Sequence, residues 1–436
     1  MSTGASRQGF AQICLGAVCV LAAILGSALA AAPEPSPVTT PAATPTIADD
    51  TLRVALVTVA PGAIYWERFG HNAILVEDRE RHTTALYNFG YFDFAQKNFF
   101  LNFIRGRMWY RLAQTDPADD LDNYRAEGRS VWLQELHFGA AAKRQLAATL
   151  AWQALPENAE YHYDYYRNNC STKVRDALDV ASGGQLRAQS LGRGRGESYR
   201  SLSLAYARAM PWLAVGIHLG LGPRADRRIN LWEEAFLPLR LRDLVSETRL
   251  TAADGTVRML ADAPRALLIA THADQIPPPP FWLPQAFVLG LSGALLLGFG
   301  VSARAPRRVA ASAIGGALIS AVIGLIGLLL AGLWLLTDHE IVWANSNLWL
   351  FSPLSLLLVP TWWRLRRPAA RPGVIAIALA VLIMASSLVV IVLDMLKLFP
   401  QAQIEWLAGL LPWHLGVLYS LWQRRSRPGN SSGAQK

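Results

Sequence analysis

The chain has 436 residues, of which 52 % are apolar and 17 % are charged, with a formal net charge of +9. This balance is typical of a membrane protein, and the length allows two or more structural units. Much of the positive charge lies in short arginine-rich loops between apolar runs near the C-terminus. Nucleic-acid binding is therefore a poor interpretation of the charge.

The first 31 residues have the pattern of an export signal. Arg7 precedes an apolar stretch over 13–25, and Ala28 and Ala30 form a cleavage site of small residues. The alternative is an uncleaved N-terminal anchor, and both interpretations place the following domain outside the cytoplasm. Residues 33–49 are rich in proline and threonine and are expected to form a tether.

Residues 50–272 have the composition of a soluble domain, for which we predict an α+β fold. Apolar runs that end at glycine, proline or polar turns predict strands, and Ala/Leu-rich or helically spaced segments predict helices. The expected strands cover 52–60, 73–77, 84–89, 130–138 and 161–165, and the expected helices cover 94–104, 139–153 and 171–180.

Residues 281–425 are expected to form a transmembrane region of about five helices, since most of the apolar runs approach the length that spans a bilayer. The segments are 281–303, 309–336, 348–363, 374–394 and 404–422. Arginines gather in alternate connecting loops, which the positive-inside rule assigns to the cytoplasm. The soluble domain then lies on the opposite, periplasmic side of the membrane.

Cys170 is the best candidate for a chemically active residue. The chain has three cysteines, and Cys14 and Cys19 lie in the apolar N-terminal run. A single remaining thiol in an exported protein indicates a reactive cysteine, although a small buried hydrophobe is the alternative. Cys170 lies just before the helix predicted over 171–180, where the helix dipole favours negative charge on a thiol, and Asn169 is a natural capping residue for that boundary.

His71 is the best candidate for a base that activates the thiol. It follows Gly70 at the start of a predicted strand, whereas His82 lies in a charged turn and His137 and His162 lie on strand-like stretches. A purely structural histidine is the alternative interpretation. Asn169 and Asn72 are candidates for a third residue that orients the pair, and Tyr163 and Asn72 are candidates for substrate contacts.

Several motifs resemble the periplasmic domain of the lipoprotein N-acyltransferases of the Lnb type. The resemblance covers most of residues 52–350, and it is carried by the segments Gly70-His71-Asn72-Ala73, Tyr87-Asn88-Phe89-Gly90, Asn169-Cys170-Ser171-Thr172 and Thr337-Asp338-His339-Glu340. It implies a permuted papain-like fold, in which the histidine on a strand precedes the cysteine at the start of a helix.

The resemblance implies acyl transfer through a thioester on Cys170, with His71 as the base and a lipoprotein or lipid as the substrate at the outer face of the inner membrane. A cysteine peptidase or amidase of the cell envelope is the alternative enzyme. A non-catalytic membrane receptor or assembly factor is the alternative from another class. We expect no cofactor and no metal.

The loop between the second and third predicted membrane helices is expected to face the same membrane surface. Asp338, His339 and Asn345 in this loop could line a site for a lipid headgroup or could form an ordinary solvated loop. Neighbouring residues of this kind rarely chelate one ion, so a metal site is not expected there.

Overall fold

The computed structural model describes residues 51–93, 96–252, 254–270, 276–398 and 400–427. The predicted export signal over 1–31, with Cys14 and Cys19, and the predicted tether over 33–49 lie outside the described residues.

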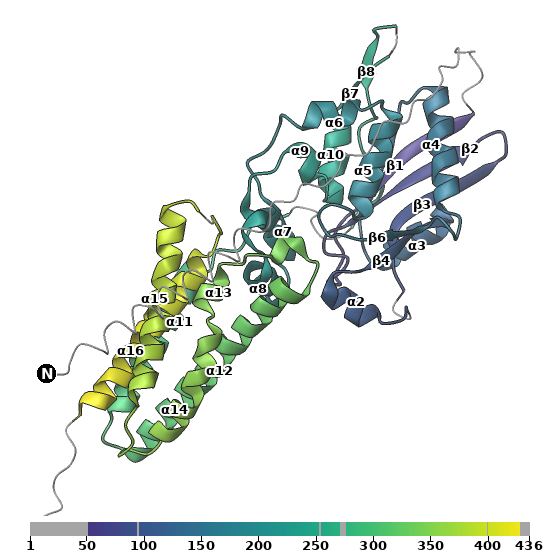
Figure 1. Ribbon diagram of the computed structural model, residues 1–436. Helices are drawn as coiled ribbons and strands as arrows, with labels where there is room; N and C mark the ends of the chain where they lie inside the picture. The colour runs from purple at the N-terminus through teal and green to yellow at the C-terminus, as the bar shows by residue number, and fades with distance from the viewer. Residues whose placement is uncertain (1–50, 94–95, 253, 271–275, 399, 428–436) are drawn as a thin grey trace, which may run out of the picture. The chain divides into compact units, whose positions relative to one another are not determined.

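The N-terminal domain is built on a seven-stranded sheet with the order β6-β4-β3-β2-β1-β5-β9 (Figure 1). Every neighbouring pair in this sheet is antiparallel. The strands are β1 Leu52–Val59, β2 His71–Asp78, β3 Thr83–Tyr91, β4 Trp109–Thr115, β5 Val131–Glu135, β6 Glu160–His162 and β9 Arg265–Leu268. With the helices described below, this sheet confirms the predicted α+β class.

The β1–β2 hairpin fixes the position of His71. The strands pair from Leu52 opposite Asp78 to Val59 opposite His71, so His71 is the first residue of its strand. Gly70 enters the strand with φ +82°, and a Cβ at this position would lie 2.7 Å from the Val59 carbonyl oxygen. Only glycine fits this turn without strain, so the glycine next to His71 sets the backbone direction.

Helices cover both faces of the sheet. On one face, α4 (Ala140–Gln153), α5 (Cys170–Ala181) and α10 (Pro238–Glu247) pack against a core that includes Leu56 and Ile74. On the other face, α3 (Pro117–Ala126) packs Leu121 and Tyr124 against alternate residues of the same strands. Because successive side chains of a strand point to opposite faces of the sheet, the same strands contribute to two apolar cores.

Shorter elements complete the domain and lead to the membrane region. They are α2 Phe99–Arg105, α6 Gln185–Ser190, α7 Tyr199–Ala207, α8 Pro211–Gly220, the 3₁₀ helix η1 Pro223–Asp226, α9 Leu231–Glu234, and a separate hairpin of β7 Arg249–Thr251 and β8 Val257–Met259.

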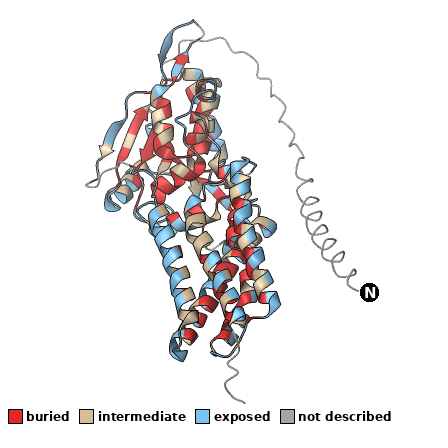
Figure 2. Ribbon diagram, turned by 90° about the vertical axis from the view of Figure 1, so that its left-hand side faces the viewer, coloured by how far each residue is buried: buried red, intermediate tan, exposed pale blue. Residues whose placement is uncertain are grey.

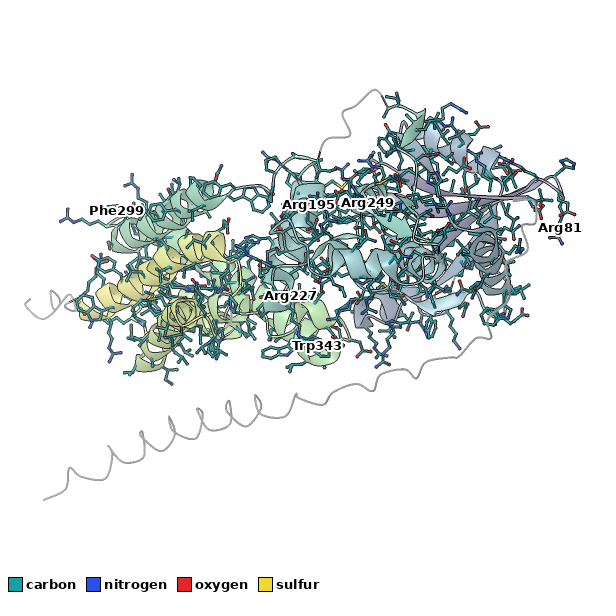
Figure 3. The ribbon with its side chains drawn as sticks, turned by 90° about the horizontal axis from the view of Figure 1, so that it is seen from above. Arg81, Arg195, Arg227, Arg249, Phe299 and Trp343 are labelled. Atoms are coloured by element: carbon teal, nitrogen blue, oxygen red, sulfur yellow. The ribbon has the colours of Figure 1, made fainter. Side chains whose placement is uncertain are left out.

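Among the described residues, three helices are long and apolar enough to cross a membrane: α11 (Leu283–Ser302), α12 (Pro306–Leu336) and α15 (Val374–Met395). They carry many exposed residues (pale blue in Figure 2). One of these is Phe299 of α11, which is 74 % exposed (Figure 3). Apolar side chains exposed in this way are suited to lipid contact.

Of the two remaining predicted membrane segments, one is broken into short elements and the other is a single helix as expected. The segment 348–363 is not one helix but is divided among α13 (Asn347–Leu350), η3 (Pro353–Leu358) and α14 (Val359–Leu365), after the short η2 (Glu340–Val342). The last helix, α16 (Ile404–Ser426), has the expected length and carries Glu405, Arg424 and Arg425. The number of membrane crossings stays a prediction.

Close packing of small residues joins the first and last of these helices. A Cβ on Gly290 of α11 would lie 2.0 Å from the carbonyl oxygen of Gly409 in α16. Such contacts let two backbones approach each other, as small residues do between membrane helices.

Candidate active site

The structure brings the start of the helix that carries Cys170 next to the start of the strand that carries His71. Cys170 begins α5, and His71 begins β2. The backbone N–H of Asn72, which follows His71, donates a hydrogen bond toward the Cys170 sulfur. The Ser171 hydroxyl lies 2.8 Å from the Asn72 side-chain oxygen, which ties the start of α5 to β2. The Cys170 residue as a whole is half-buried.

A chain of hydrogen bonds fixes the orientation of the His71 ring. Its Nε2 lies 2.9 Å from Oδ1 of Asn88, and the Asn88 amide nitrogen lies 2.8 Å from the Thr115 hydroxyl and 2.9 Å from Oδ2 of Asp120. An ionised carboxylate only accepts hydrogen bonds, so the Asn88 nitrogen faces Asp120 and its oxygen faces His71. Nε2 of His71 therefore carries the proton, and Nδ1 is left as the basic nitrogen.

Burial keeps the thiol and the imidazole uncharged at neutral pH. Desolvation lowers the pKa of His71 to about 4, against the opposing effect of the hydrogen bond with Asn88. Desolvation also raises the pKa of Cys170 to about 11 and outweighs the backbone N–H groups of Asn72, Ser171 and Cys170, which lower it. The expected stabilisation of a thiolate by the helix N-terminus is present but is the smaller effect.

The residues around Cys170 position the first turn of its helix. Asn169 caps α5, because its side-chain oxygen accepts from the Thr172 backbone N–H and the Thr172 hydroxyl accepts from the Asn169 backbone. The Asn169 amide also donates to the carbonyl oxygens of Tyr165 and Phe236. Its contacts thus orient Cys170 through the backbone. A direct catalytic role for Asn169 stays a prediction.

The side chain of Asn72 is fully buried and lies between β1 and α5. Its amide nitrogen donates to the Thr58 hydroxyl at 2.9 Å, and its oxygen faces Ser171. The predicted contact of Asn72 with a substrate stays a prediction, and the backbone N–H beside the sulfur is the part of Asn72 suited to it.

Gly90 lies against the side chain of Cys170. Its φ is +99°, and a Cβ there would lie 3.3 Å from Cβ of Cys170, 3.9 Å from the Tyr161 hydroxyl and 4.0 Å from Cε2 of Tyr163. Three side chains thus converge on the place where any other residue would put an atom. Tyr163 stacks on Tyr110 with ring centroids 4.1 Å apart, which suits its predicted role as a wall of the substrate site.

The Tyr161 hydroxyl is buried and has no hydrogen-bond partner among the described residues. Burial raises the pKa of Tyr161, and the negative charge that Cys170 would carry raises it further. The Tyr161 hydroxyl therefore keeps its proton. Burying a hydrogen-bond donor without an acceptor costs free energy, and a ligand that accepts from the hydroxyl would remove this cost.

The predicted loop residues contact the domain that precedes the membrane helices. Asp338 forms an ion pair with Arg107 at 2.7 Å, and His339 stacks on Tyr165 and lies 3.0 Å from the Phe103 carbonyl oxygen. Asn345 is buried and bonded to the carbonyl oxygens of Leu219 and Gly220. Substrate contacts for Asp338, His339 and Asn345 stay predictions.

The other histidines of the domain have different surroundings. His82 occupies an exposed turn with φ +50°. His137 lies 3.0 Å from Asp262, and His218 lies 3.2 Å from Glu405 of α16. His71 differs from these histidines in that the next residue, Asn72, contacts the Cys170 sulfur through its backbone N–H.

The sequence did not single out Asn88, Asp120, Gly90 or Tyr161 as members of the site. Asn88 and Gly90 stand in one of the motifs that carry the family resemblance, which was the available signal. Asp120 lies in α3, and its contact with Asn88 depends on how that helix packs on the sheet. Within the described part of the chain, no group of three metal-ligating side chains could hold a metal ion.

The fold and the site together define a class: a membrane protein whose α+β domain pairs a cysteine at a helix N-terminus with a histidine at the start of a strand. Two family models match the chain, the Lnb N-terminal periplasmic domain over residues 39–203 and the Lnb transmembrane domain over residues 287–402. Together they cover more than half of the sequence, and the chain belongs to the Lnb family. Comparison with curated proteins and with solved structures gives no match.

Proposed function

We propose that this protein is a thiol acyltransferase that works at the outer face of the bacterial inner membrane. It takes an acyl group from an ester of a diacylglyceryl-modified lipoprotein or a phospholipid and passes it to an amino group of a lipoprotein. The observation that carries the proposal is the hydrogen bond from the backbone N–H of Asn72, the neighbour of His71 in the chain, toward the Cys170 sulfur. The series His71–Asn88–Asp120 leaves Nδ1 of the ring as the basic nitrogen.

In the first half-reaction, the Cys170 sulfur attacks the ester carbonyl while Nδ1 of His71 takes the thiol proton. The carbonyl oxygen becomes negatively charged as the C–S bond forms. The ester C–O bond then breaks, and His71 returns the proton to the leaving alcohol. Since both groups are neutral at rest, proton transfer accompanies the attack instead of preceding it.

In the second half-reaction, the amino group of the acceptor attacks the thioester carbonyl. The C–S bond breaks, an amide forms, and the proton released by the amine returns to the Cys170 sulfur by way of His71. If water takes the place of the amine, the same site releases a fatty acid. The transferase therefore depends on an acceptor site that excludes water.

The Tyr161 hydroxyl and the backbone N–H of Cys170 are suited to donate to the developing oxyanion. The hydroxyl lies near Gly90, as Cys170 does, and it lacks a partner among the described residues. The carbonyl oxygen of an ester bound beside Cys170 would give it the missing acceptor. Donors of this kind act most strongly on charge that appears in the transition state.

Replacing Tyr161 with phenylalanine is expected to slow acylation of Cys170 by roughly 10- to 100-fold, because one donor to the oxyanion is lost. Stopped-time mass spectrometry of the thioester would give the rate. Tyr165→Phe is the matched control, since that hydroxyl contacts the Met108 sulfur. Equal rates in the wild type and Tyr161→Phe would remove Tyr161 from the mechanism.

Two other functions can be distinguished from acyl transfer by experiment. A peptidase or amidase of the cell envelope could use the same pair of side chains on an amide. A non-catalytic receptor would need neither an ionisable thiol nor an oriented imidazole, and the geometry around His71 argues against it. The membrane helices favour a lipid-anchored substrate over a cell-wall polymer.

Incubation of the full-length protein with a synthetic diacylated lipopeptide tests the proposal directly. We expect an acyl-sized mass on the peptide that contains Cys170, labile to hydroxylamine, and an N-acylated lipopeptide as the product. Free fatty acid without N-acylated product would indicate a hydrolase. Cleavage of peptidoglycan amides without acylation of Cys170 would indicate the amidase. If neither product forms, both enzyme hypotheses are refuted.

A further inference from the structure

The α/β domain presents a set of exposed apolar side chains next to the membrane helices. We call Ile64, Tyr65, Trp66, Phe100, Ile104 and Trp212 the apolar rim. Phe100 is 70 % exposed, Ile104 60 % and Trp212 64 %, and the three residues of the 64–66 turn are between 43 % and 45 % exposed. Exposed apolar residues gathered in this way mark an interaction surface.

One end of the apolar rim is joined to the end of α12. The Arg105 carbonyl oxygen, at the end of α2, accepts from the Asp338 backbone N–H at 2.8 Å. Asp338 stands two residues beyond Leu336, the last residue of α12, and Leu336 is 77 % exposed. The end of α2 therefore lies beside the end of α12, and the exposed ion pair of Arg107 and Asp338 stands at the junction.

The other end of the apolar rim is joined to the start of α11. Tyr65 and Trp212 lie edge to face with ring centroids 6.0 Å apart. Trp212 is on α8, and Ile217 and Leu213 of this helix pack in the same cluster as Trp282, which precedes α11. Both ends of the rim thus lie beside ends of membrane-spanning helices, on the side that carries the α/β domain.

Charge and residue type favour a lipid surface over a protein partner. Exposed Lys97 and Arg105 stand at the two ends of α2, where they could meet lipid phosphates. Tryptophan and tyrosine are the residues typical of the bilayer interface. Short helices with an apolar face and flanking cations lie in the plane of the interface.

We propose that the apolar rim inserts into the outer leaflet of the bilayer that the protein spans. The rim is also the start of a series of aromatic contacts toward the thiol: Trp66 to Phe92 at 6.5 Å, Phe92 to Tyr110 at 5.1 Å, and Tyr110 to Tyr163 at 4.1 Å. Insertion of the rim does not depend on the proposed acyl transfer. If both hold, an ester in the leaflet reaches Cys170 along these rings.

Spin labels on the full chain in nanodiscs of phosphatidylethanolamine and phosphatidylglycerol test the insertion. Phe100→Cys, Ile104→Cys and Trp212→Cys are labelled one at a time in a background without other cysteines, and collision rates with oxygen and with a water-soluble nickel complex are compared. Val180→Cys on α5, where Val180 is 72 % exposed, is the matched aqueous control. All these positions are exposed, so the fold should tolerate each label.

We expect oxygen to dominate over the nickel complex at two or more rim positions and the reverse at Val180. Labels on the rim that are as accessible to the nickel complex as the Val180 label would overturn the proposal. Labels shielded from both reagents would also overturn it and would indicate a protein partner. Because the background lacks Cys170, none of these outcomes depends on acyl transfer.

Discussion

Replacing Cys170 with serine is expected to abolish acyl transfer to a lipopeptide, with a rate loss of about 10⁴-fold or more. The base in this site is weak, because burial lowers the pKa of His71 to about 4. It can assist a thiol, whose pKa here is about 11, but a serine hydroxyl holds its proton much more tightly. Product formation measured by mass spectrometry gives the comparison.

The substitution changes one atom at the start of α5 and should leave the fold intact. The cap formed by Asn169 and Thr172 does not use the sulfur, so the thermal unfolding midpoint should stay within a few degrees of the wild type. Ser171→Thr is not a suitable control, since Ser171 contacts Asn72. A Cys170→Ser protein that keeps a tenth or more of the activity would show that the nucleophile lies elsewhere.

Both principal site residues could be found from local sequence signals. Gly70 marks a turn into a strand, so His71 was expected at the start of that strand. Asn169 marks a helix boundary, so Cys170 was expected just before the helix, and the structure has it as the first helical residue. These signals are short-range, because glycine conformation and helix capping depend on a few neighbouring residues. The family match confirmed the resemblance that the motifs carried.

The partner of His71 depended on information that the local sequence does not hold. The sequence pointed to Asn169 and Asn72 as orienting residues, since they are adjacent to the pair. In the structure the ring contacts Asn88, whose place is set by the register that puts it opposite Ala73 on β2. Pairing between strands is a long-range property, and a shift of one residue would turn Asn88 to the other face.

The charge state of the thiol was the other feature that sequence could not supply. A helix N-terminus and a nearby histidine favour a thiolate, and both are present. The magnitude of desolvation depends on how much protein surrounds the sulfur, including Tyr161 and Tyr163. That quantity exists only in the folded structure, and here it decides the direction of the pKa.

Replacing His71 with alanine is expected to lower acyl transfer at pH 7 by about 10³-fold or more, because the base that takes the thiol proton is lost. In the wild type the imidazole stays neutral above its pKa of about 4, so transfer should persist as the pH falls from 7 to about 5. At high pH the thiolate forms without help, so the variant should recover part of its activity as the pH approaches 11.

The pH dependence of Cys170 alkylation by iodoacetamide shows whether Cys170 and His71 are neutral at rest or form a thiolate–imidazolium ion pair. With a neutral pair, the alkylation rate should rise with pH toward a midpoint near 11 in the wild type, and His71→Ala should change this profile little. His82→Ala, a substitution in an exposed turn, is the matched histidine control. A wild-type plateau below pH 7 that His71→Ala removes would instead show a thiolate–imidazolium pair at rest, because only the charged imidazole could hold the thiolate at that pH.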